Sequence, residues 1–315
     1  MQRRQFLKAG TATAASIGST SSYAKSSEPL TLVVPFGPGG QSDVLLRSIG
    51  ERAARYLGRP VIADNKAGAG GLVALNIIHG AKPDRNIITQ MSVGAYRMPY
   101  MQDTPWNPVA DFTYIIRLWG FPIGVAVPTA SPFHSMADVV SFARKEPGAF
   151  TFGTAGIAVT GHLALEELAM MAGVKITHVP FRGGAEAVQA TLGNHVLAIS
   201  DSASWGPLVD SGQLRLIGTF TEQRTRWGAP TMKEQGYDLV FPSPAGLVGP
   251  RGMPLPVVKE LHDAFKKALD EPEIRELLKR NDQLVAYQSS EEYAEYGRQA
   301  FIDERKILVR LGLSK

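Results

Sequence analysis

The chain has 315 residues, of which 44% are hydrophobic and 20% are charged, as in ordinary water-soluble globular proteins, and it is long enough for two domains. Its formal net charge is +4 without the clustered Lys and Arg that a nucleic-acid surface needs, and it has no cysteine for disulfides, thiolate metal sites or a lipid anchor. Beyond the N-terminal segment, no stretch approaches the ~18 apolar residues of a membrane span.

Residues 1–24 have the pattern of an export signal. Arg3-Arg4 lies in a charged segment that continues with Phe6-Leu7-Lys8, and a weakly apolar run rich in Ala, Thr and Ser follows. Ser22-Tyr23-Ala24 has the small-x-small form of a cleavage site. Because paired arginines are typical of the twin-arginine export route, we expect a periplasmic protein whose fold starts after residue 24.

The expected fold begins with a strand, a glycine-rich loop and a helix. Residues 31–34 form a β-branched run that Pro35 ends, as in a buried strand. The first glycine loop, residues 35–43, holds three glycines and two prolines and cannot be helical. Apolar residues then recur at helical spacing, and Ser42 or Asp43 is the predicted N-cap of that helix.

Such a junction directs free backbone N–H groups and the positive end of a helix dipole to one point, where an anion can bind. The loop is neither a Walker A motif nor a dinucleotide-binding Gly-x-Gly-x-x-Gly motif. A glycine turn before a helix is as often only a turn. On these residues alone, anion binding and a plain turn therefore remain equal alternatives.

Strand–loop–helix units repeat after the first helix. This order predicts a parallel, doubly wound sheet, in which ligands lie beyond the carboxyl ends of the strands. The loops at 35–43, 65–71 and 92–96 should then share one rim of that sheet. Residues 97–122, rich in Pro, Trp and Tyr, are expected to be irregular. The other elements expected here are strand 60–63, helix 72–79 and strand 86–91.

A second α/β unit is expected at residues 129–243. It contains a capping box at 135–138 and the second glycine loop, residues 154–161, which again joins a strand to a helix. Apolar strands closed by proline flank this unit and predict that the chain crosses to a second lobe and returns. We therefore assign 25–128 and 244–315 to lobe 1 and 129–243 to lobe 2. The C-terminal part is expected to be helical at 255–268, 272–278 and 290–311.

Side-chain groupings typical of enzymes are weak in this sequence. His162 and Glu166 are one helical turn apart, but two ligands without a third favour a structural pair over a metal site. Asp201 follows a strand, where it could cap that strand end or face a ligand. Trp205 is expected in the core, with a position in the cleft as the alternative. A hydrolase or lyase that uses Asp201 and His162 is the enzymatic alternative.

The most informative pattern is the pairing of the two glycine loops. Each ends a strand, begins a helix and belongs to a different lobe. Helix N-termini that converge on a cleft would hold a carboxylate with little side-chain charge, and closure of the lobes would bury it. The residues alone therefore predict an anion-binding cleft.

Several spaced motifs between residues 32 and 313 resemble one known family. They are Pro35-Phe36-Gly37-Pro38-Gly39-Gly40 with Asp43, Asn65-Lys66-Ala67-Gly68-Ala69-Gly70-Gly71, Gly153-Thr154-Ala155-Gly156 with His162-Leu163, His178-Val179-Pro180-Phe181-Arg182-Gly183-Gly184, Asp201, Gly246-Leu247-Val248-Gly249-Pro250, and the segment from Ser289 to Tyr293. On these motifs the chain resembles the periplasmic receptors of the tripartite tricarboxylate transporter group, also called Bug-type solute-binding proteins.

The resemblance implies a type II periplasmic-binding-protein fold, an α/β architecture of two doubly wound lobes with a ligand cleft between them. It implies a non-enzymatic, monomeric receptor that captures a small organic carboxylate and delivers it to the subunits of a membrane permease. No cofactor, metal or nucleic acid is expected. The ligand-binding residues carried over by position are Phe36, Gly39, Gly40, Gln41, Ser42, Asp43, Ser92, Gly94, Ala95, Thr154, Gly156, Ile157, Val159, Thr160, Asp201 and Ser202.

This chain departs from the family pattern in the second glycine loop. Ile157, Ala158 and Val159 stand where small polar residues are common, and Ser202 stands where Asn is frequent. We therefore expect a cleft with an apolar second wall, which favours an aromatic or alkyl carboxylate over citrate or an amino acid. A receptor that reports to a signalling partner instead of a permease is a further alternative.

Overall fold

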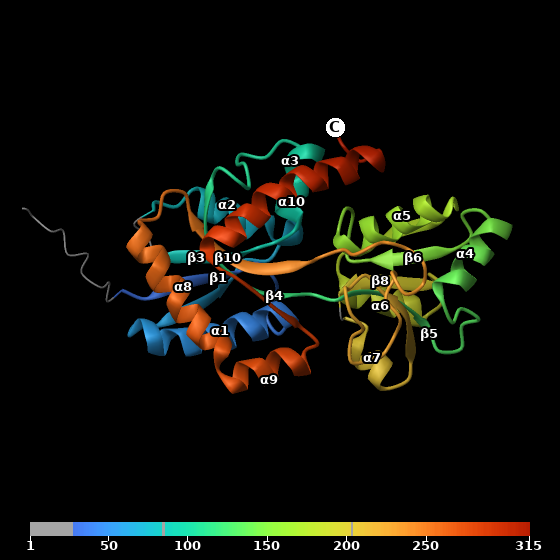
Figure 1. The fold of residues 1–315 in the computed structure, drawn as a ribbon, viewed down its shortest axis with the longest axis horizontal. Coiled ribbons are helices and arrows are strands. Elements are labelled where there is room, and N and C mark those ends of the chain that lie inside the picture. The colour runs from blue at the N-terminus through green and yellow to red at the C-terminus, as the bar shows by residue number, and fades with distance from the viewer. Residues whose placement is uncertain (1–27, 84–85, 203) are drawn as a thin grey trace, which may run out of the picture.

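The computed structural model describes residues 28–83, 86–202 and 204–315, which form two lobes side by side (Figure 1). The predicted export signal, residues 1–24, lies outside the described residues. Within the described part of the chain, no helix is long and apolar enough to cross a membrane. Lobe 1 is built from both ends of the chain and lobe 2 from its middle.

Lobe 1 is built on a six-stranded sheet with the order β11-β4-β10-β3-β1-β2. Strands β1, β2 and β3 are parallel to one another, but β10 is antiparallel to both β3 and β4, and β11 is antiparallel to β4. The sheet is therefore mixed and not parallel throughout as expected, because the chain that returns from lobe 2 enters it in the opposite direction. The strands are β1 (Leu30–Val34), β2 (Val61–Asn65), β3 (Ile87–Met91), β4 (Phe112–Gly120), β10 (Pro244–Pro250) and β11 (Leu284–Gln288).

Helices cover both faces of this sheet, as strands that are apolar on both faces require. α1 (Gln41–Leu57) and α8 (Leu255–Asp270) pack on one face, and α9 (Pro272–Arg280) follows α8. The other face is covered by α2 (Leu72–His79), which the 3-10 turn η1 (Ala69–Gly71) precedes, by α3 (Gly94–Met101) and by α10 (Ser290–Arg310) (Figure 1).

Lobe 2 has a five-stranded sheet with the order β7-β6-β8-β5-β9, in which β5 runs antiparallel to both neighbours. Helix α4 begins at the predicted capping box: the Asp138 N–H donates to Ser135 Oγ, and the Asp138 carboxylate accepts the Ser135 N–H. The strands are β5 (Ile123–Pro128), β6 (Thr151–Thr154), β7 (Thr177–Pro180), β8 (Ala198–Ser202) and β9 (Leu214–Thr219), and the helices are α4 (Met136–Lys145), α5 (Thr160–Ala172), α6 (Gly184–Leu192) and α7 (Gly206–Asp210).

Two expectations for the first half of the chain need correction. Residues 123–128 pair with β8 and β9 and belong to the sheet of lobe 2, so the chain crosses near residues 121–122 and not after residue 128. Residues 97–122, expected to be irregular, hold most of α3 and all of β4. The pattern hid both elements, because α3 contains Pro99 and β4 is covered on both faces and lacks polar alternation.

Helix α10 ties the two lobes together along one side (Figure 1). Near its start, Tyr293 is fully buried in the core of lobe 1, whereas Leu308 near its end is fully buried in the core of lobe 2. Tyr100 and Met101, at the end of α3, also pack against the core of lobe 2. One side of the interlobe boundary is therefore a packed apolar contact.

Candidate functional site

The first glycine loop is supported by the carboxylate of Asp43, which is 4% exposed. Its Oδ2 accepts the Gly39 N–H at 2.9 Å, and its Oδ1 accepts from Asn65 Nδ2 and from Arg47 Nε, each at 2.8 Å. Asn65 Nδ2 also donates to the carbonyl oxygen of Phe36 at 2.9 Å. Burial alone would raise the pKa of Asp43, but these hydrogen bonds lower it below its ordinary value. The charged carboxylate thus organises the loop from within lobe 1.

Helix α1 begins with Gly40 as its N-cap, not with Ser42 or Asp43 as expected. Ser42 is buried in the first turn, and Gln41 Nε2 donates to the carbonyl oxygen of Asn281 at 2.6 Å. The first-turn N–H groups of a helix have no partner within the helix. They are therefore the groups that this loop can offer to an anion.

The loops that follow β1, β2 and β3 meet at one rim of the lobe 1 sheet. A Cβ on Gly71 would lie 3.2 Å from both Pro35 Cβ and Ser92 Oγ. Ser92 is 7% exposed, and its hydroxyl has no hydrogen-bond partner among the described residues. Gly94 then begins α3, and Ala95 is fully buried. A buried hydroxyl without a partner costs free energy, so Ser92 is a polar group that a ligand or water at this rim would satisfy.

The second glycine loop is supported by two imidazole rings. Thr154 Oγ1 donates to the carbonyl oxygen of Gly156 at 2.7 Å, so in its 2.7 Å contact with His178 Nε2 the imidazole is the donor. The Ala158 N–H donates to His162 Nδ1 at 3.0 Å, so that nitrogen carries no proton. The two rings stack, with centroids 3.7 Å apart and planes 15° apart.

Both imidazoles are neutral at neutral pH. Burial, with the charges of His178 and Arg97 as smaller causes, lowers the pKa of His162 to about 3, and burial lowers the pKa of His178 to about 4. Glu166 Oε1 lies 4.0 Å from His162 Nε2, and burial raises the pKa of Glu166. At 4.0 Å and with a neutral imidazole, His162 and Glu166 are neighbours on α5 and not an ion pair.

The side of the second loop that faces solvent is apolar. Ile157 is 64% exposed, whereas Ala158 is 5% exposed and belongs to the core of lobe 2. Gly156 has a φ of +140°, which favours glycine, and lets the chain turn there. Val159 is the half-buried N-cap of α5, and Thr160 starts that helix. Ile157 is therefore the apolar side chain that this loop presents.

Arg97, which the sequence analysis did not single out, connects lobe 1 to the second loop. It lies on α3 and is 1% exposed. Its Nη1 donates to the carbonyl oxygen of Ala158 at 2.9 Å and to Thr160 Oγ1 at 3.3 Å. Its Nε and Nη2 donate to the two carboxylate oxygens of Glu304 on α10 at 2.8 and 2.7 Å. One indication of this role was present in the sequence, which is that Arg97 directly follows the aromatic Tyr96. An arginine in an apolar segment is expected to be buried only with a partner for its charge.

Asp201 and Ser202 end β8 and are both half-buried. Asp201 Oδ2 accepts from Ser204 Oγ at 2.6 Å, and a Cβ on Gly184 would collide with the same oxygen. Burial raises the pKa of Asp201. Trp205 Nε1 donates to the Asp201 carbonyl oxygen at 2.9 Å, and Trp205 is fully buried. Trp205 is thus a core residue, as expected, and does not line the cleft.

A second arginine crosses between the lobes at an exposed position. Arg226 of lobe 2 forms an ion pair with Asp282, in the turn between α9 and β11 of lobe 1, and donates to Asp210 of α7 at 2.8 Å. Arg226 and Asp210 are 45% and 44% exposed. The neighbouring Asn281 accepts from Gln41, so this turn links the first loop to lobe 2.

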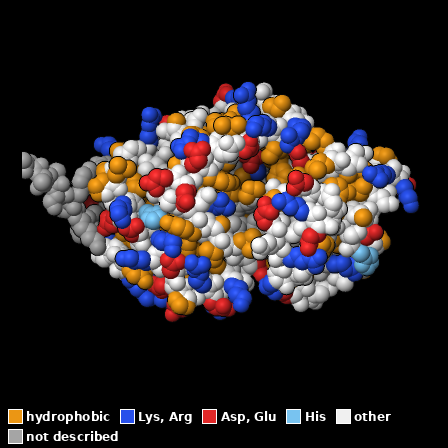
Figure 2. Space-filling view, viewed as in Figure 1, with side chains coloured by type: hydrophobic (Ala, Val, Ile, Leu, Met, Phe, Trp, Pro, Cys, Tyr) orange, Lys and Arg blue, Asp and Glu red, His pale blue; other side chains and the backbone are white. Residues whose placement is uncertain are grey.

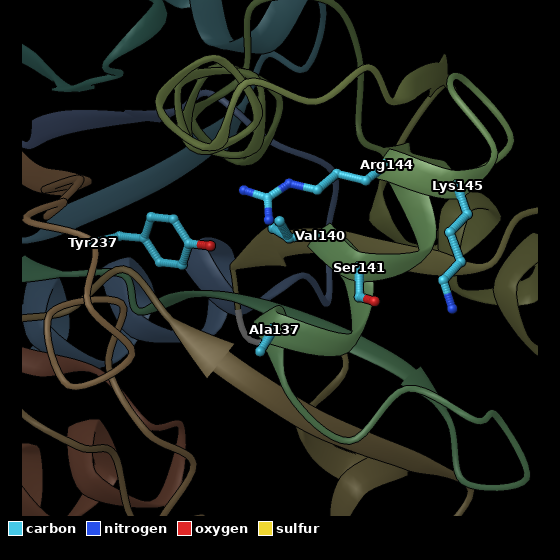
Figure 3. A pocket seen from close by; sticks show the side chains of 6 residues that line it. All are labelled: Ala137, Val140, Ser141, Arg144, Lys145 and Tyr237. Atoms are coloured by element: carbon cyan, nitrogen blue, oxygen red, sulfur yellow. The ribbon is translucent and has the colours of Figure 1, made fainter.

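Two cavities lie away from the predicted ligand-binding residues. One of about 370 Å³ is bordered by Arg144 on α4 and by Tyr237 (Figure 3). The other, of about 340 Å³, lies between α10 and residues 238–242 and is bordered by Glu304. None of the predicted ligand-binding residues lines either cavity, so neither cavity coincides with the predicted ligand site.

The arrangement is suited to binding an anion, and it engages His162 and Asp201, the two residues of the enzymatic alternative, in separate hydrogen bonds. His162 is bonded to Ala158 and Asp201 to Ser204, and no hydrogen bond joins His162 to Asp201 in the described chain. Among residues 28–83, 86–202 and 204–315, no group of three or more His, Cys, Asp or Glu could hold a metal ion. Acidic and basic side chains are interspersed on the face drawn in Figure 2. In its described part, this face therefore shows no surface of one charge that would attract an anion.

Comparison with known proteins identifies the family. A model described as "Tripartite tricarboxylate transporter family receptor" matches residues 45–313. The "UPF0065 protein in gbd 5'region" of Cupriavidus necator is 39% identical over 325 residues, which cover 100% of this chain and 99% of that protein.

Solved structures confirm the two-lobed periplasmic-binding-protein fold. A TctC solute-binding protein from Polaromonas is 28% identical, with a TM-score of 0.75, and covers 90% of this chain and 98% of its own. A protein from R. palustris, solved with adipate, is 26% identical, with a TM-score of 0.83, and covers 91% of this chain and 98% of its own. The matching family model describes receptors, and the Polaromonas protein is described as a solute-binding protein. The chain belongs to the tripartite tricarboxylate transporter receptor family.

Proposed function

We propose that this protein is a periplasmic receptor that captures a small organic carboxylate between its lobes and delivers it to a tripartite tricarboxylate-type permease. The observation that carries the proposal is the pair of glycine loops, each held in its conformation by a side-chain acceptor. Asp43 and His162 each accept a backbone N–H of their own loop, at Gly39 and Ala158. The first-turn N–H groups of α1 and α5 have no partner within their helices and, with the positive helix ends, suit a carboxylate.

The proposed ligand contacts are the residues that the family motif identifies in the segments 36–43, 92–95, 154–160 and 201–202. Backbone groups of the two glycine loops would bind the carboxylate, and the unpartnered hydroxyl of Ser92 would add one side-chain contact. Asp43 and Asp201 would act by shaping their loops, since their carboxylates already accept hydrogen bonds from loop residues.

The ligand class that we propose is an alkyl or aromatic carboxylate. Ile157 exposes 64% of its surface on the second loop, so a ligand there would meet an apolar wall. The R. palustris relative was solved with adipate, a flexible alkyl dicarboxylate, which supports the same class. Citrate, with more polar groups per carbon, would leave those groups facing Ile157 without partners.

Calorimetric titration of the mature protein with adipate, benzoate and citrate tests this proposal. We expect adipate or benzoate to bind at one site per chain and to be recovered unchanged, and citrate to bind more weakly. The variant Ile157→Ser should weaken binding of the preferred acid by about fivefold to tenfold, because apolar burial is lost. Met170→Ser, at a 41% exposed position on α5, is the matched control and should have no effect.

Tighter binding of citrate would contradict the apolar wall, and consumption of the ligand would contradict the receptor role. The permease and the monomeric state need separate tests. Affinity capture from membranes with ligand-loaded protein should recover permease subunits, whereas recovery of a sensor protein would favour the signalling alternative. Light scattering on the purified protein measures the oligomeric state.

A further inference from the structure

The interlobe contact contains two arginines in opposite environments. Arg97 is 1% exposed and lies between α3, α10 and the second glycine loop. Arg226 is 45% exposed and lies between α7 and the turn at Asp282. Both cross from one lobe to the other, but only Arg97 contacts a residue predicted to bind the ligand, Thr160.

The hydrogen-bonding capacity of Arg97 is divided between two elements. Its Nε and Nη2 hold both carboxylate oxygens of Glu304, in the planar two-pronged geometry that only arginine offers. Its Nη1 remains for the Ala158 carbonyl oxygen and Thr160 Oγ1, on either side of the N-cap of α5. Glu304 is 8% exposed and compensates the charge, so the guanidinium can lie in the protein interior without attracting an anion itself.

Apolar side chains of α3 and α10 extend the contact between the lobes beyond Arg97. Tyr100 and Met101 of α3, and Ile307 and Leu308 of α10, all pack against the core of lobe 2. Opening the lobes at this side would expose that apolar surface and would break the bonds of Arg97 to Ala158. On the Arg226 side, separation would break the ion pair between Arg226, whose side chain is 45% exposed, and Asp282, whose side chain is 10% exposed. An ion pair with one partner in solvent contributes less than a buried one.

We propose that Arg97 is a positioning residue that holds the second glycine loop of lobe 2 in a fixed place relative to α3 and α10. The rim at Ser92 directly precedes α3, so Arg97 joins two groups of predicted ligand contacts that belong to different lobes. This inference rests on the proposed receptor function. With the loop already in place, binding does not spend free energy on ordering it, which is the usual benefit of preorganisation.

Distances between spin labels test the proposal without any ligand. The chain has no cysteine, so Lys279→Cys on α9 and Lys175→Cys in lobe 2, both at exposed positions, introduce one label in each lobe. We expect a narrow distance distribution by double electron–electron resonance in the otherwise unchanged protein. The pair Arg97→Met with Glu304→Met removes both charges together and avoids a lone buried charge. It should broaden the distribution and lengthen its mean.

Two further variants separate positioning from a general loss of stability. Arg97→Lys keeps the charge but cannot reach Glu304 and Ala158 in the same planar geometry, so it should broaden the distribution partly. Arg226→Met removes the exposed interlobe arginine and should leave the distribution unchanged. Melting temperatures of all variants show that each one is folded. An unchanged distribution in both Arg97 variants, whatever their melting temperatures, would overturn the proposal.

Affinity for adipate supplies the second readout. The Arg97→Met, Glu304→Met variant should bind about tenfold more weakly, as the loss of two anchoring hydrogen bonds predicts, and Arg226→Met should bind normally. Equal weakening by Arg226→Met would contradict a specific role for Arg97. If neither adipate nor benzoate binds the unchanged protein, the proposed ligand class fails, while the label distances still decide the role of Arg97.

Discussion

The two glycine loops occupy corresponding places in the two lobes, but different chemistry supports them. In lobe 1 a charged carboxylate, Asp43, accepts three hydrogen bonds, all from its own lobe. In lobe 2 two neutral imidazoles, His162 and His178, bond to the loop, and Arg97 reaches it from the other lobe. A strand-to-helix loop needs acceptors for its own N–H groups, and either a carboxylate or an imidazole nitrogen supplies them. The difference therefore affects tolerance to mutation and pH more than shape.

The largest expected effect distinguishes the glycines at the start of the two helices. A Cβ on Gly161 would collide with the carbonyl oxygen of Ser200, whereas a Cβ on Gly40 would lie 3.3 Å from the Gly37 oxygen. We expect Gly161→Ala to lower the free energy of unfolding by about 3 kcal/mol and Gly40→Ala by less than about 1 kcal/mol. Urea unfolding measures both. Equal losses of unfolding free energy in the two variants would mean that α5 does not pack as closely against β8 as the structure shows.

The next effect tests the charged support of the first loop. Asp43→Ala removes an acceptor shared by Gly39, Asn65 and Arg47, and we expect it to lower the free energy of unfolding by about 2 kcal/mol. Asp43→Asn keeps one acceptor and should lose less. If Asp43→Asn costs as much as the alanine variant, the negative charge matters more than the bonds to the loop.

The pH dependence of stability tests the neutral support of the second loop. The native pKa values of His162 and His178, about 3 and about 4, lie below the unfolded value near 6.5. The unfolded chain therefore binds protons that the native protein does not. Stability is complete above about pH 6.5 and falls as the pH is lowered, by about 1.4 kcal/mol per pH unit for each histidine.

Denaturant unfolding between pH 7 and pH 4 measures this slope, and His178→Gln should reduce it by about half. Asp43 contributes in a lower window, because its native pKa is depressed and its stabilisation is lost only as the pH falls below the ordinary carboxylate range. An unchanged slope in His178→Gln would show that His178 is already protonated in the native state, against the pKa of about 4 that its burial produces.

Local chemistry was predictable from the sequence. The capping box at Ser135 forms as expected, and helix α2 spans the predicted residues 72–79, since both depend on neighbours along the chain. The first glycine loop was also identified, but its N-cap was misplaced, because Asp43 bonds back to Gly39 and leaves Gly40 as the cap. Strand β4 was missed, since burial on both faces removes the polar alternation that identifies a strand.

The sequence by itself therefore determined the two glycine loops, the helices that follow them and, through its motifs, the receptor family. Only the tertiary structure decided that residues 123–128 pair in the sheet of lobe 2, because strand pairing depends on partners such as β8 that are distant in the chain. The same holds for Arg97, whose partner Glu304 lies 207 residues further on. A buried charge in the sequence shows that a partner must exist, but packing chooses which one.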